Sequence, residues 1–496
     1  MNYRLVSRFL SLLVALFSLS MSLALPFAMW YGEWSEFLHF IESAAMGCAL
    51  AGILYTFGRR ATGEMYRREA LAVVGLSWVL AAGVGALPFY FSGMIGSYSG
   101  SYFESMSGLT TTGASVLTNI ESNAKCLLFW RSFLHFVGGL GIIVLFVAVL
   151  PLVGVGGRVL FKQEVPGPVP EGMTPRIKDT AMLLLKVYVG FNVLQALLLM
   201  FAGLTPFDAI NHAMATLATG GFSTKNTSVL AFGSQAVEWI IIVFMFLAGT
   251  NFSLHLEAVQ GRFSYWKSTE FRAYLLGILG SAIFITVLLH VSGATFTEPG
   301  SAPVVSNTSG IHFRDALFAT LSMQTTTGFA TVDFDRWPEA ARFLLVALML
   351  VGGCAGSTGG GIKVIRWVIL FKVARQELGR AVSPRRVRVL KIDGKPMRPE
   401  TVGQVQTFFY LYIVIIVVGS ILLALLEPDT KLLSTFTAVV SALNNIGPGL
   451  EEVGPTMNYA FMEAPALWLL SLLMLLGRLE LLAVLVFFSR TFWHPR

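Results

Sequence analysis

The sequence is poor in charged and in chemically reactive side chains. Of its 496 residues, 13% are Asp, Glu, Lys or Arg, whereas a soluble domain carries roughly 25%. Its three cysteines, Cys48, Cys126 and Cys354, are scattered and show neither a disulfide framework nor metal-ligand spacing. We find no cluster of nucleophile, carboxylate or metal-ligand motifs in the apolar runs. An all-α membrane protein is therefore favoured over an intramembrane enzyme, and we expect no cofactor in this chain.

Apolar residues are abundant, at 55% of the chain. They gather in runs near the ~20 residues that cross a hydrocarbon core. We expect ten spanning helices, near 6–30, 36–57, 70–93, 126–152, 181–203, 236–258, 272–292, 340–373, 404–427 and 463–489. Four shorter apolar segments, at 98–122, 206–226, 312–332 and 432–450, have the length of helices that re-enter the membrane without crossing it.

The net charge of +7 has a topological explanation. Lys and Arg gather in the loops at 59–68, 158–178, 262–272 and 372–398, and near both ends of the chain. If the four short segments re-enter, all of these loops lie on one face, and basic loops collect on the cytoplasmic side. We expect a multi-pass protein in membrane lipid with both termini in the cytoplasm, and no binding of nucleic acid.

Each short segment ends in a patch rich in glycine and polar residues. The order helix, short helix, patch, helix occurs four times, with reference glycines Gly113, Gly220, Gly328 and Gly447 at nearly even intervals. Irregular backbone at membrane depth is stable only where it is buried or lines water, and rings of carbonyl groups can replace the hydration shell of K⁺. Four copies around one pore predict an ion filter. The alternative is that Thr and Gly serve close helix packing.

The patches TTTGAS, LATGGFS, TTTGFAT and NNIGPGL resemble the four filter segments of the Trk/Ktr/HKT potassium transporter superfamily. The two N-terminal helices are similar to those of its TrkH/TrkG branch. The resemblance implies four pseudo-symmetric helix–pore-helix–filter–helix repeats, at 61–160, 161–262, 263–385 and 386–496, after an N-terminal pair at 1–60. The filter residues would be Thr111, Thr112, Gly113, Ala218, Thr219, Gly220, Thr326, Thr327, Gly328, Asn445, Ile446 and Gly447.

The resemblance also implies an activity and partners. Gly113 stands where sodium-transporting plant relatives carry Ser, so we expect K⁺ uptake across a bacterial cytoplasmic membrane. Asn445-Ile446 departs from the other segments, which leaves a sodium or mixed Na⁺/K⁺ transporter as the alternative. A homodimer and a separate TrkA-like cytosolic nucleotide-binding ring are implied. The sequence does not distinguish a symporter from a channel-like pathway. A scaffold subunit that carries no ion flux of its own is a further alternative.

The run VGGCAGSTGGGIK interrupts the apolar span at 340–373. Six of the ten residues 352–361 are glycine, a composition that breaks helices. Ile362 precedes Lys363 and no Ser or Thr follows, so the register excludes a phosphate-binding loop. We expect a flexible loop beneath the filter, and the resemblance implies that it is the gate. Its glycines are Gly352, Gly353, Gly356, Gly359, Gly360 and Gly361.

Two arginines lie inside apolar runs. A charge such as Arg478 at the bilayer centre costs at least ~2.5–3.5 kcal/mol, so we expect it to face the ion path below the filter as an electrostatic barrier. The alternative is a buried pair with a carboxylate of another helix. Arg131 stands at the start of its helix, where we expect an interface anchor or a helix-end partner. Glu104 falls within the first short helix.

Overall fold

The computed structural model describes residues 1–63, 65–153, 177–292, 309–383, 389–479, 481–485, 487 and 489–493. Within these ranges the chain is helical, apart from an antiparallel hairpin of β1 (Lys391–Ile392) and β2 (Lys395–Pro396). This confirms the all-α fold class. Two of the predicted repeat boundaries, at residues 160 and 385, lie outside the described residues, and the remaining boundaries stay predictions.

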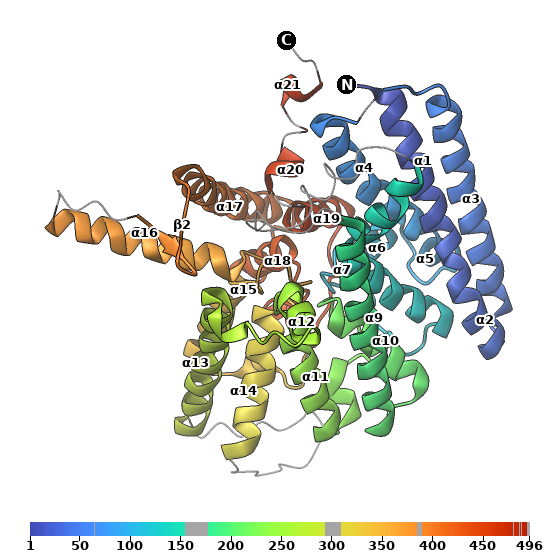
Figure 1. Ribbon diagram of the computed structural model, residues 1–496. Helices are drawn as coiled ribbons and strands as arrows, with labels where there is room; N and C mark the ends of the chain where they lie inside the picture. Colours follow the sequence, from blue (N-terminus) through green and yellow to red (C-terminus); the bar gives the residue numbers. More distant parts are fainter. Residues whose placement is uncertain are drawn as a thin grey trace.

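The N-terminal pair stands at one edge of the molecule (Figure 1). It consists of α1 (Tyr3–Ser20), η1 (Met21–Ala24), α2 (Leu25–Tyr31) and α3 (Trp34–Gly58). Between α2 and α3, the Glu33 carboxylate accepts hydrogen bonds from the N–H groups of Lys125 (2.6 Å) and Cys126 (2.9 Å). These N–H groups begin a helix whose positive end favours an anion. The pair is thereby fixed to the first of four helical groups that follow.

The four groups share one order of elements: a long helix, a short helix, a Gly-containing segment and a further helix. The first group comprises α4 (Arg67–Gly85), α5 (Leu87–Phe91), α6 (Tyr98–Leu109) and α7 (Lys125–Val153). The second comprises α9 (Ile177–Phe201), α10 (Pro206–Leu217), η2 (Ser228–Phe232), α11 (Gln235–Ala248), α12 (Phe252–Val259) and η3 (Tyr265–Lys267).

The third and fourth groups repeat that order. The third comprises α13 (Thr269–Val291), α14 (Ser309–Gln324), η4 (Phe334–Arg336), α15 (Glu339–Met349) and α16 (Val364–Val382). The fourth comprises α17 (Pro399–Leu426), α18 (Leu432–Asn444), η5 (Glu451–Val453), α19 (Ala464–Arg478), α20 (Leu481–Leu485) and α21 (Arg490–Trp493). The short helices α6, α10, α14 and α18 coincide with the four predicted short segments.

Six of the described helices are long and apolar enough to cross a membrane, and α11 with α12 makes a seventh if that pair counts as one span. The prediction of one helix over 236–258 is wrong in one respect, because two helices, α11 and α12, occupy this range and are bent by 99° at their junction. The side chain of Asn251 caps α12 by accepting from Ser253 N at 2.8 Å. The expected interruption after 350 is confirmed and separates α15 from α16.

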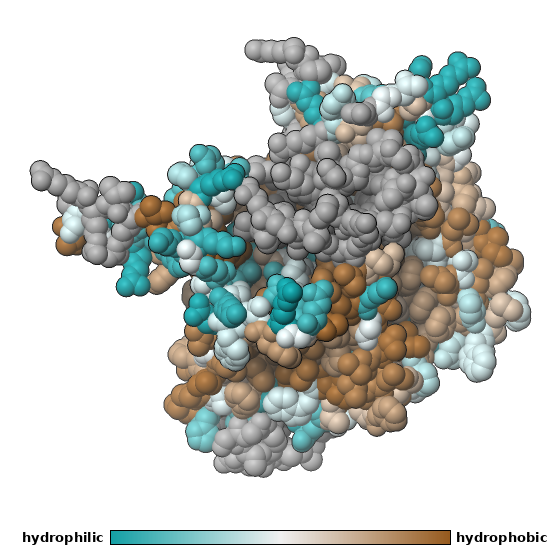
Figure 2. Space-filling model, viewed as in Figure 1, coloured by the Kyte–Doolittle hydropathy of each residue, from teal (hydrophilic) through white to brown (hydrophobic). Residues whose placement is uncertain are grey.

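The surface divides into an apolar region and a polar end. Figure 2 shows apolar side chains over much of the face that includes α9, α11 and α13, and hydrophilic side chains around the base of α16. In Figure 1 α16 projects as an arm on the left, and α21 lies near the N-terminus at the top. The stacked rings of Tyr3 and Trp493, 6.5 Å apart, bring the first and last described helices together. These two helices therefore lie on the same side of the molecule.

Candidate ion pathway and gating loop

The four short helices end in the same way. In each, a backbone N–H just past the helix reaches back to a carbonyl five residues earlier: Thr112 to Ser107 (2.8 Å), Gly220 to Ala215 (2.8 Å), Thr327 to Ser322 (2.9 Å) and Ile446 to Ser441 (3.0 Å). This is the Schellman bond, which places the preceding residue in the left-handed region. Those residues are Thr111, Thr219, Thr326 and Asn445, with φ between 52° and 60°.

Threonine rarely adopts this conformation, because its branched Cβ crowds the backbone there. Strain of this kind persists only where the surroundings hold it, and it gathers at functional sites. Three of the four helix ends carry such a threonine, and all three are fully buried. The repetition of one costly conformation marks the segments 110–115, 218–223, 325–330 and 444–449, here called the Gly segments, as a built site.

Two residues after each of these positions comes a glycine with positive φ. The values are 83° at Gly113, 79° at Gly221, 79° at Gly328 and 105° at Gly447. The second segment therefore aligns through Gly221, and the choice of Gly220 as its reference glycine is wrong by one residue. Gly220 corresponds to Thr112, Thr327 and Ile446, while Ala218 is the C-cap of α10, one position before the left-handed residue.

The Gly segments form a closed ring. A Cβ atom built at Gly113 would strike the carbonyl oxygen of Gly220, one at Gly221 that of Thr327, and one at Gly328 that of Ile446. The ring closes where a Cβ at Gly447 would come within 2.7 Å of the Thr112 carbonyl oxygen. Each segment thus presents an equivalent carbonyl to the glycine of its neighbour. Glycine is required at these four positions, both for its φ and for this close approach.

The ring is only approximately fourfold. In the first and third segments, the hydroxyls of Thr110 and Thr112, and of Thr325 and Thr327, lie 2.8 Å apart. In the fourth segment, Asn445 Nδ2 donates to Thr112 Oγ1 (3.0 Å) and to the Met474 carbonyl (2.9 Å). Asn445 therefore ties the fourth segment to the first by a side-chain bond.

The loop between α15 and α16 comprises residues 350–363 and is here called the Gly-rich loop. It lies against the C-terminal ends of short helices. Its base is closed by a bridge from Val351 to Ile362, with Gly352 N donating to Ile362 O at 3.0 Å. At its tip, Gly360 N donates to Thr326 Oγ1 (2.6 Å), and Thr358 Oγ1 donates to Leu217 O (2.9 Å). The tip thus bonds to the third Gly segment through Thr326 and to the short helix α10 through Leu217.

Arg478 completes these contacts from the end of α19. Its Nη1 donates to the Thr358 carbonyl in the Gly-rich loop at 2.8 Å, and its Nη2 donates to the Gly138 carbonyl in α7 at 2.6 Å. The loop is thus bonded to the second, third and fourth groups directly, and to the first group through Arg478. Carbonyl oxygens, and not a carboxylate, receive the two hydrogen bonds described here.

Glu270, which no sequence pattern singles out, holds the Gly-rich loop and the start of α16. This buried carboxylate, in the first turn of α13, accepts from Ala355 N at 2.7 Å and from Ile365 N at 3.2 Å. Hydrogen bonds to a charged acceptor are roughly twice as strong as neutral ones. A Glu in a first helical turn is common, so its role depends on a contact more than eighty positions away and leaves no local pattern.

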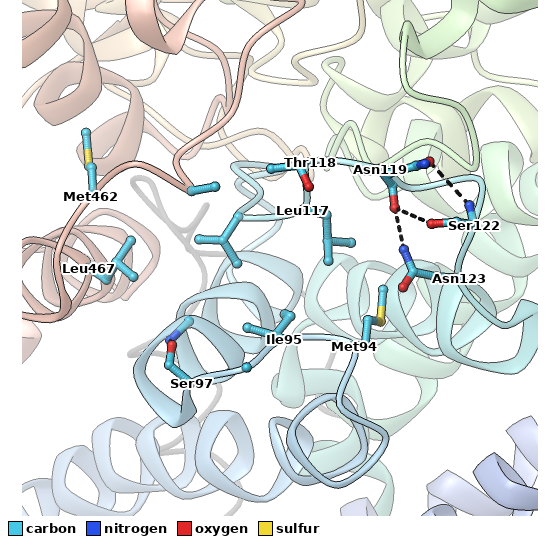
Figure 3. Close-up of a pocket in the computed structure, with 14 residues that line it drawn as sticks. Met94, Ile95, Ser97, Leu117, Thr118, Asn119, Ser122, Asn123, Met462 and Leu467 are labelled. Carbon is cyan, nitrogen blue, oxygen red and sulfur yellow. Dashed lines mark hydrogen bonds between the residues drawn. The ribbon is translucent and has the colours of Figure 1, made fainter.

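On the outer side, a cavity of about 340 Å³ lies between the first and fourth groups (Figure 3). Its wall includes Val116 and Leu117, which follow the first Gly segment, together with Ile95 and Met462. Asn119, Ser122 and Asn123 form a hydrogen-bonded polar rim. Within the described ranges, no group of three or more His, Cys, Asp or Glu residues could hold a metal ion.

These features define a polytopic helical membrane protein in which four short helices converge on a ring of Gly segments above a broken helix. A family model described as TrkH, cation transport protein, matches residues 39–494. The chain therefore belongs to the TrkH family of cation transport proteins, which are not enzymes.

Individual relatives match over the whole chain. The chain is 39% identical over 498 residues to the Trk system potassium uptake protein TrkH of Salmonella typhimurium, with full coverage of both. It is 33% identical to the Trk system potassium uptake protein TrkG of Escherichia coli, with 99% of each covered. The crystal structure of the potassium transporter TrkH from Vibrio parahaemolyticus superimposes with a TM-score of 0.86, at 36% identity and full coverage of both chains.

Proposed function

We propose that this protein mediates potassium uptake across a bacterial cytoplasmic membrane and that the ring of Gly segments is its selectivity filter. The observation that carries the proposal is the closed contact ring, in which four backbone segments present equivalent carbonyls from Thr112, Gly220, Thr327 and Ile446. Carbonyl rings substitute for the hydration shell of K⁺. The names of the full-length relatives support the choice of ion.

The short helices support the same function. All four end at the ring, so their C-terminal ends, each equivalent to roughly half a negative charge, converge there. Such a field favours a cation over an anion. Potassium is preferred to sodium because glycine, without a hydroxyl, occupies the four ring positions. The residues proposed for the filter are those predicted from the sequence, with Gly221 added in the second segment.

We assign the gate to the Gly-rich loop and Arg478. The support is positional: the loop tip bonds to Thr326 in the third Gly segment, and a Cβ at Gly360 would strike the Asn444 carbonyl at the end of α18. A chain in this place obstructs the route below the ring. Arg478 adds a positive charge at the same level and holds the tip through Thr358. Loop movement would then open the route.

The orientation follows from charge. We place both termini on the same side of the membrane as the α16 arm, which carries Lys372, Arg375 and Arg380. By the preference of Lys and Arg for the cytoplasmic side, this side is cytoplasmic in the proposed arrangement. A TrkA-like nucleotide-binding ring would dock there, and the protein would act as a homodimer.

The test is ion uptake by the purified protein in liposomes, using Rb⁺ as a tracer for K⁺ and Na⁺ as the competitor. We expect Rb⁺ uptake that excess K⁺ suppresses and excess Na⁺ leaves largely unchanged. Equal suppression by both ions would support the mixed Na⁺/K⁺ alternative. Absence of uptake, both with and without a cytosolic ring protein, would contradict transport by this chain.

A further inference from the structure

Two buried charged side chains next to the Gly segments have no part in the proposed pathway. Glu104 in α6 and Arg131 in α7 form an ion pair of 2.8 Å, and the exposed fractions of their side chains are 0% and 1%. A buried pair of this kind is expensive to desolvate and contributes little net stability. Its position directly behind the Gly segments calls for a role other than stability.

Both members of the pair contact the segments. Glu104 Oε1 accepts from Ser115 Oγ at 2.9 Å, and Glu104 Oε2 accepts from Val116 N at 3.0 Å. These bonds fix the chain immediately after Gly113. Arg131 Nη2 reaches Ser115 Oγ at 3.3 Å, so the same hydroxyl joins both charges.

Arg131 also extends to the second segment. Its Nη1 donates to the Ser223 carbonyl at 3.2 Å, and its guanidinium lies 4.0 Å from the centre of the Phe222 ring. The planar guanidinium presents several donors in fixed directions, which lysine cannot reproduce. One side chain therefore sets the distance between the first and second Gly segments.

The other segments are supported differently. Glu104 and His212 occupy equivalent positions before Gly113 and Gly221, and His212 Nε2 contacts Ser223 Oγ at 2.9 Å as Glu104 contacts Ser115. The corresponding residues of the third and fourth groups are Ala319 and Ala438. The Glu104 carboxylate thus supports the first Gly segment, and the imidazole of His212 supports the second.

The outer cavity explains why the first segment needs this support. Val116 and Leu117 line the cavity on one side (Figure 3), so packing there is incomplete. Apart from the bond from Tyr459 N to Ser115 O (2.8 Å), the described bonds from other elements to Ser115 and Val116 come from Glu104 and Arg131. We propose that Glu104 and Arg131 are positioning residues that set the geometry of the first two filter segments and thereby the discrimination of K⁺ over Na⁺. This inference depends on the proposed filter.

The most direct test removes the shared side-chain link to the first segment and keeps the ion pair. Ser115→Ala deletes the hydroxyl that Glu104 and Arg131 share, while the Glu104–Arg131 contact remains. We expect the ratio of Rb⁺ to Na⁺ uptake in liposomes to fall roughly two- to tenfold, the effect of one net hydrogen bond, with total cation flux retained. The matched control is Ser101→Ala, which removes a buried hydroxyl of α6 that donates to Ser97 within that helix.

A second comparison addresses the pair itself. Glu104→Gln and Arg131→Gln each leave one buried charge without its partner and are expected to lower the protein yield. The double variant Glu104→Gln with Arg131→Gln removes both charges and restores yield, but the low ion ratio should persist. A purely structural pair would instead recover the wild-type ratio together with the yield.

The outcomes separate the inference from the proposed function. If the wild-type protein transports Rb⁺ selectively, and both Ser115→Ala and the double variant keep its Rb⁺ to Na⁺ ratio at normal yield, the positioning role is overturned. If the wild-type protein shows no cation uptake, the proposed function itself fails. A lower ratio in Ser115→Ala and an unchanged one in Ser101→Ala support the inference.

Discussion

Arg478→Ala should open the pathway. The substitution removes two hydrogen bonds from a charged donor, at 2.8 Å to Thr358 in the Gly-rich loop and at 2.6 Å to Gly138 in α7. Hydrogen bonds to charged groups contribute roughly 1.5–3 kcal/mol each, and only the bond to Thr358 attaches the loop, so the loop loses about 1.5–3 kcal/mol of its attachment. Because about 1.4 kcal/mol corresponds to a tenfold change, the open population should rise by a factor on the order of ten to a hundred.

Two further substitutions at this position distinguish its charge from its hydrogen bonds. Arg478→Lys keeps the positive charge but lacks the fork that reaches two carbonyls, whereas Arg478→Gln keeps a donor and loses the charge. If attachment of the loop dominates, the Lys variant should conduct more than wild type. If repulsion of the cation dominates, the Lys variant should resemble wild type, and the Gln variant should approach the Ala variant.

The assay is Rb⁺ uptake into liposomes that contain equal amounts of each folded variant, with and without a cytosolic ring protein. We expect the largest gain without the ring, where the wild-type loop stays closed. Folded Arg478→Ala protein with wild-type flux under both conditions would refute the gating assignment. A scarce, unfolded Arg478→Ala protein would instead support the alternative of a structural arginine.

Three other substitutions test separate parts of the pathway. Gly113→Ser introduces a Cβ that would strike the Gly220 carbonyl and strain of about 1–3 kcal/mol at positive φ; Na⁺ should then compete better with Rb⁺, while Gly96→Ser, in open space, should leave competition unchanged. Deletion of Gly359–Gly361 removes the bond from Gly360 to Thr326 and should raise Rb⁺ flux; equal or lower flux at normal yield would indicate a structural loop. Glu270→Gln weakens the bonds to Ala355 in the loop and to Ile365 at the start of α16 and should raise flux roughly two- to tenfold; an unchanged rate would remove Glu270 from the gate.

The positions of the helices could be predicted because hydrocarbon imposes a length on every span. The short helices and the interruption after Leu350 also leave a compositional pattern, since glycine-rich polar stretches are conspicuous among apolar runs. The bend between α11 and α12 leaves a much weaker compositional pattern. Only Gly249, Thr250 and Asn251 separate those helices, and the bend is stabilised by Phe252 N donating to Gly356 O, a partner distant in sequence.

The alignment of the second Gly segment could not be predicted from composition. Gly220 directly follows Thr219, as Gly113 follows Thr112, so a pattern that asks for glycine after threonine selects Gly220 and not the adjacent Gly221. The Schellman bond from Gly220 N and the φ of 79° at Gly221 decide between them. A comparison of the four sequences aligns residue types, whereas the equivalent positions of the four segments are defined by their backbone dihedral angles. The error is one residue, and it leaves Gly220 in the ring as a source of a carbonyl.

The two arginines in apolar runs illustrate a further limit. Composition shows that each charge needs a partner, but not which partner it has. Arg131 is paired with the Glu104 carboxylate, and both side chains are buried on two fixed helices, so breaking the pair would leave opposite charges apart in a medium that screens them poorly. The described bonds of Arg478 go to carbonyl oxygens, one of them in a loop. Water can replace a carbonyl partner at far lower cost than it can replace a buried carboxylate. The first arrangement suits a permanent support, and the second suits a contact that is made and released.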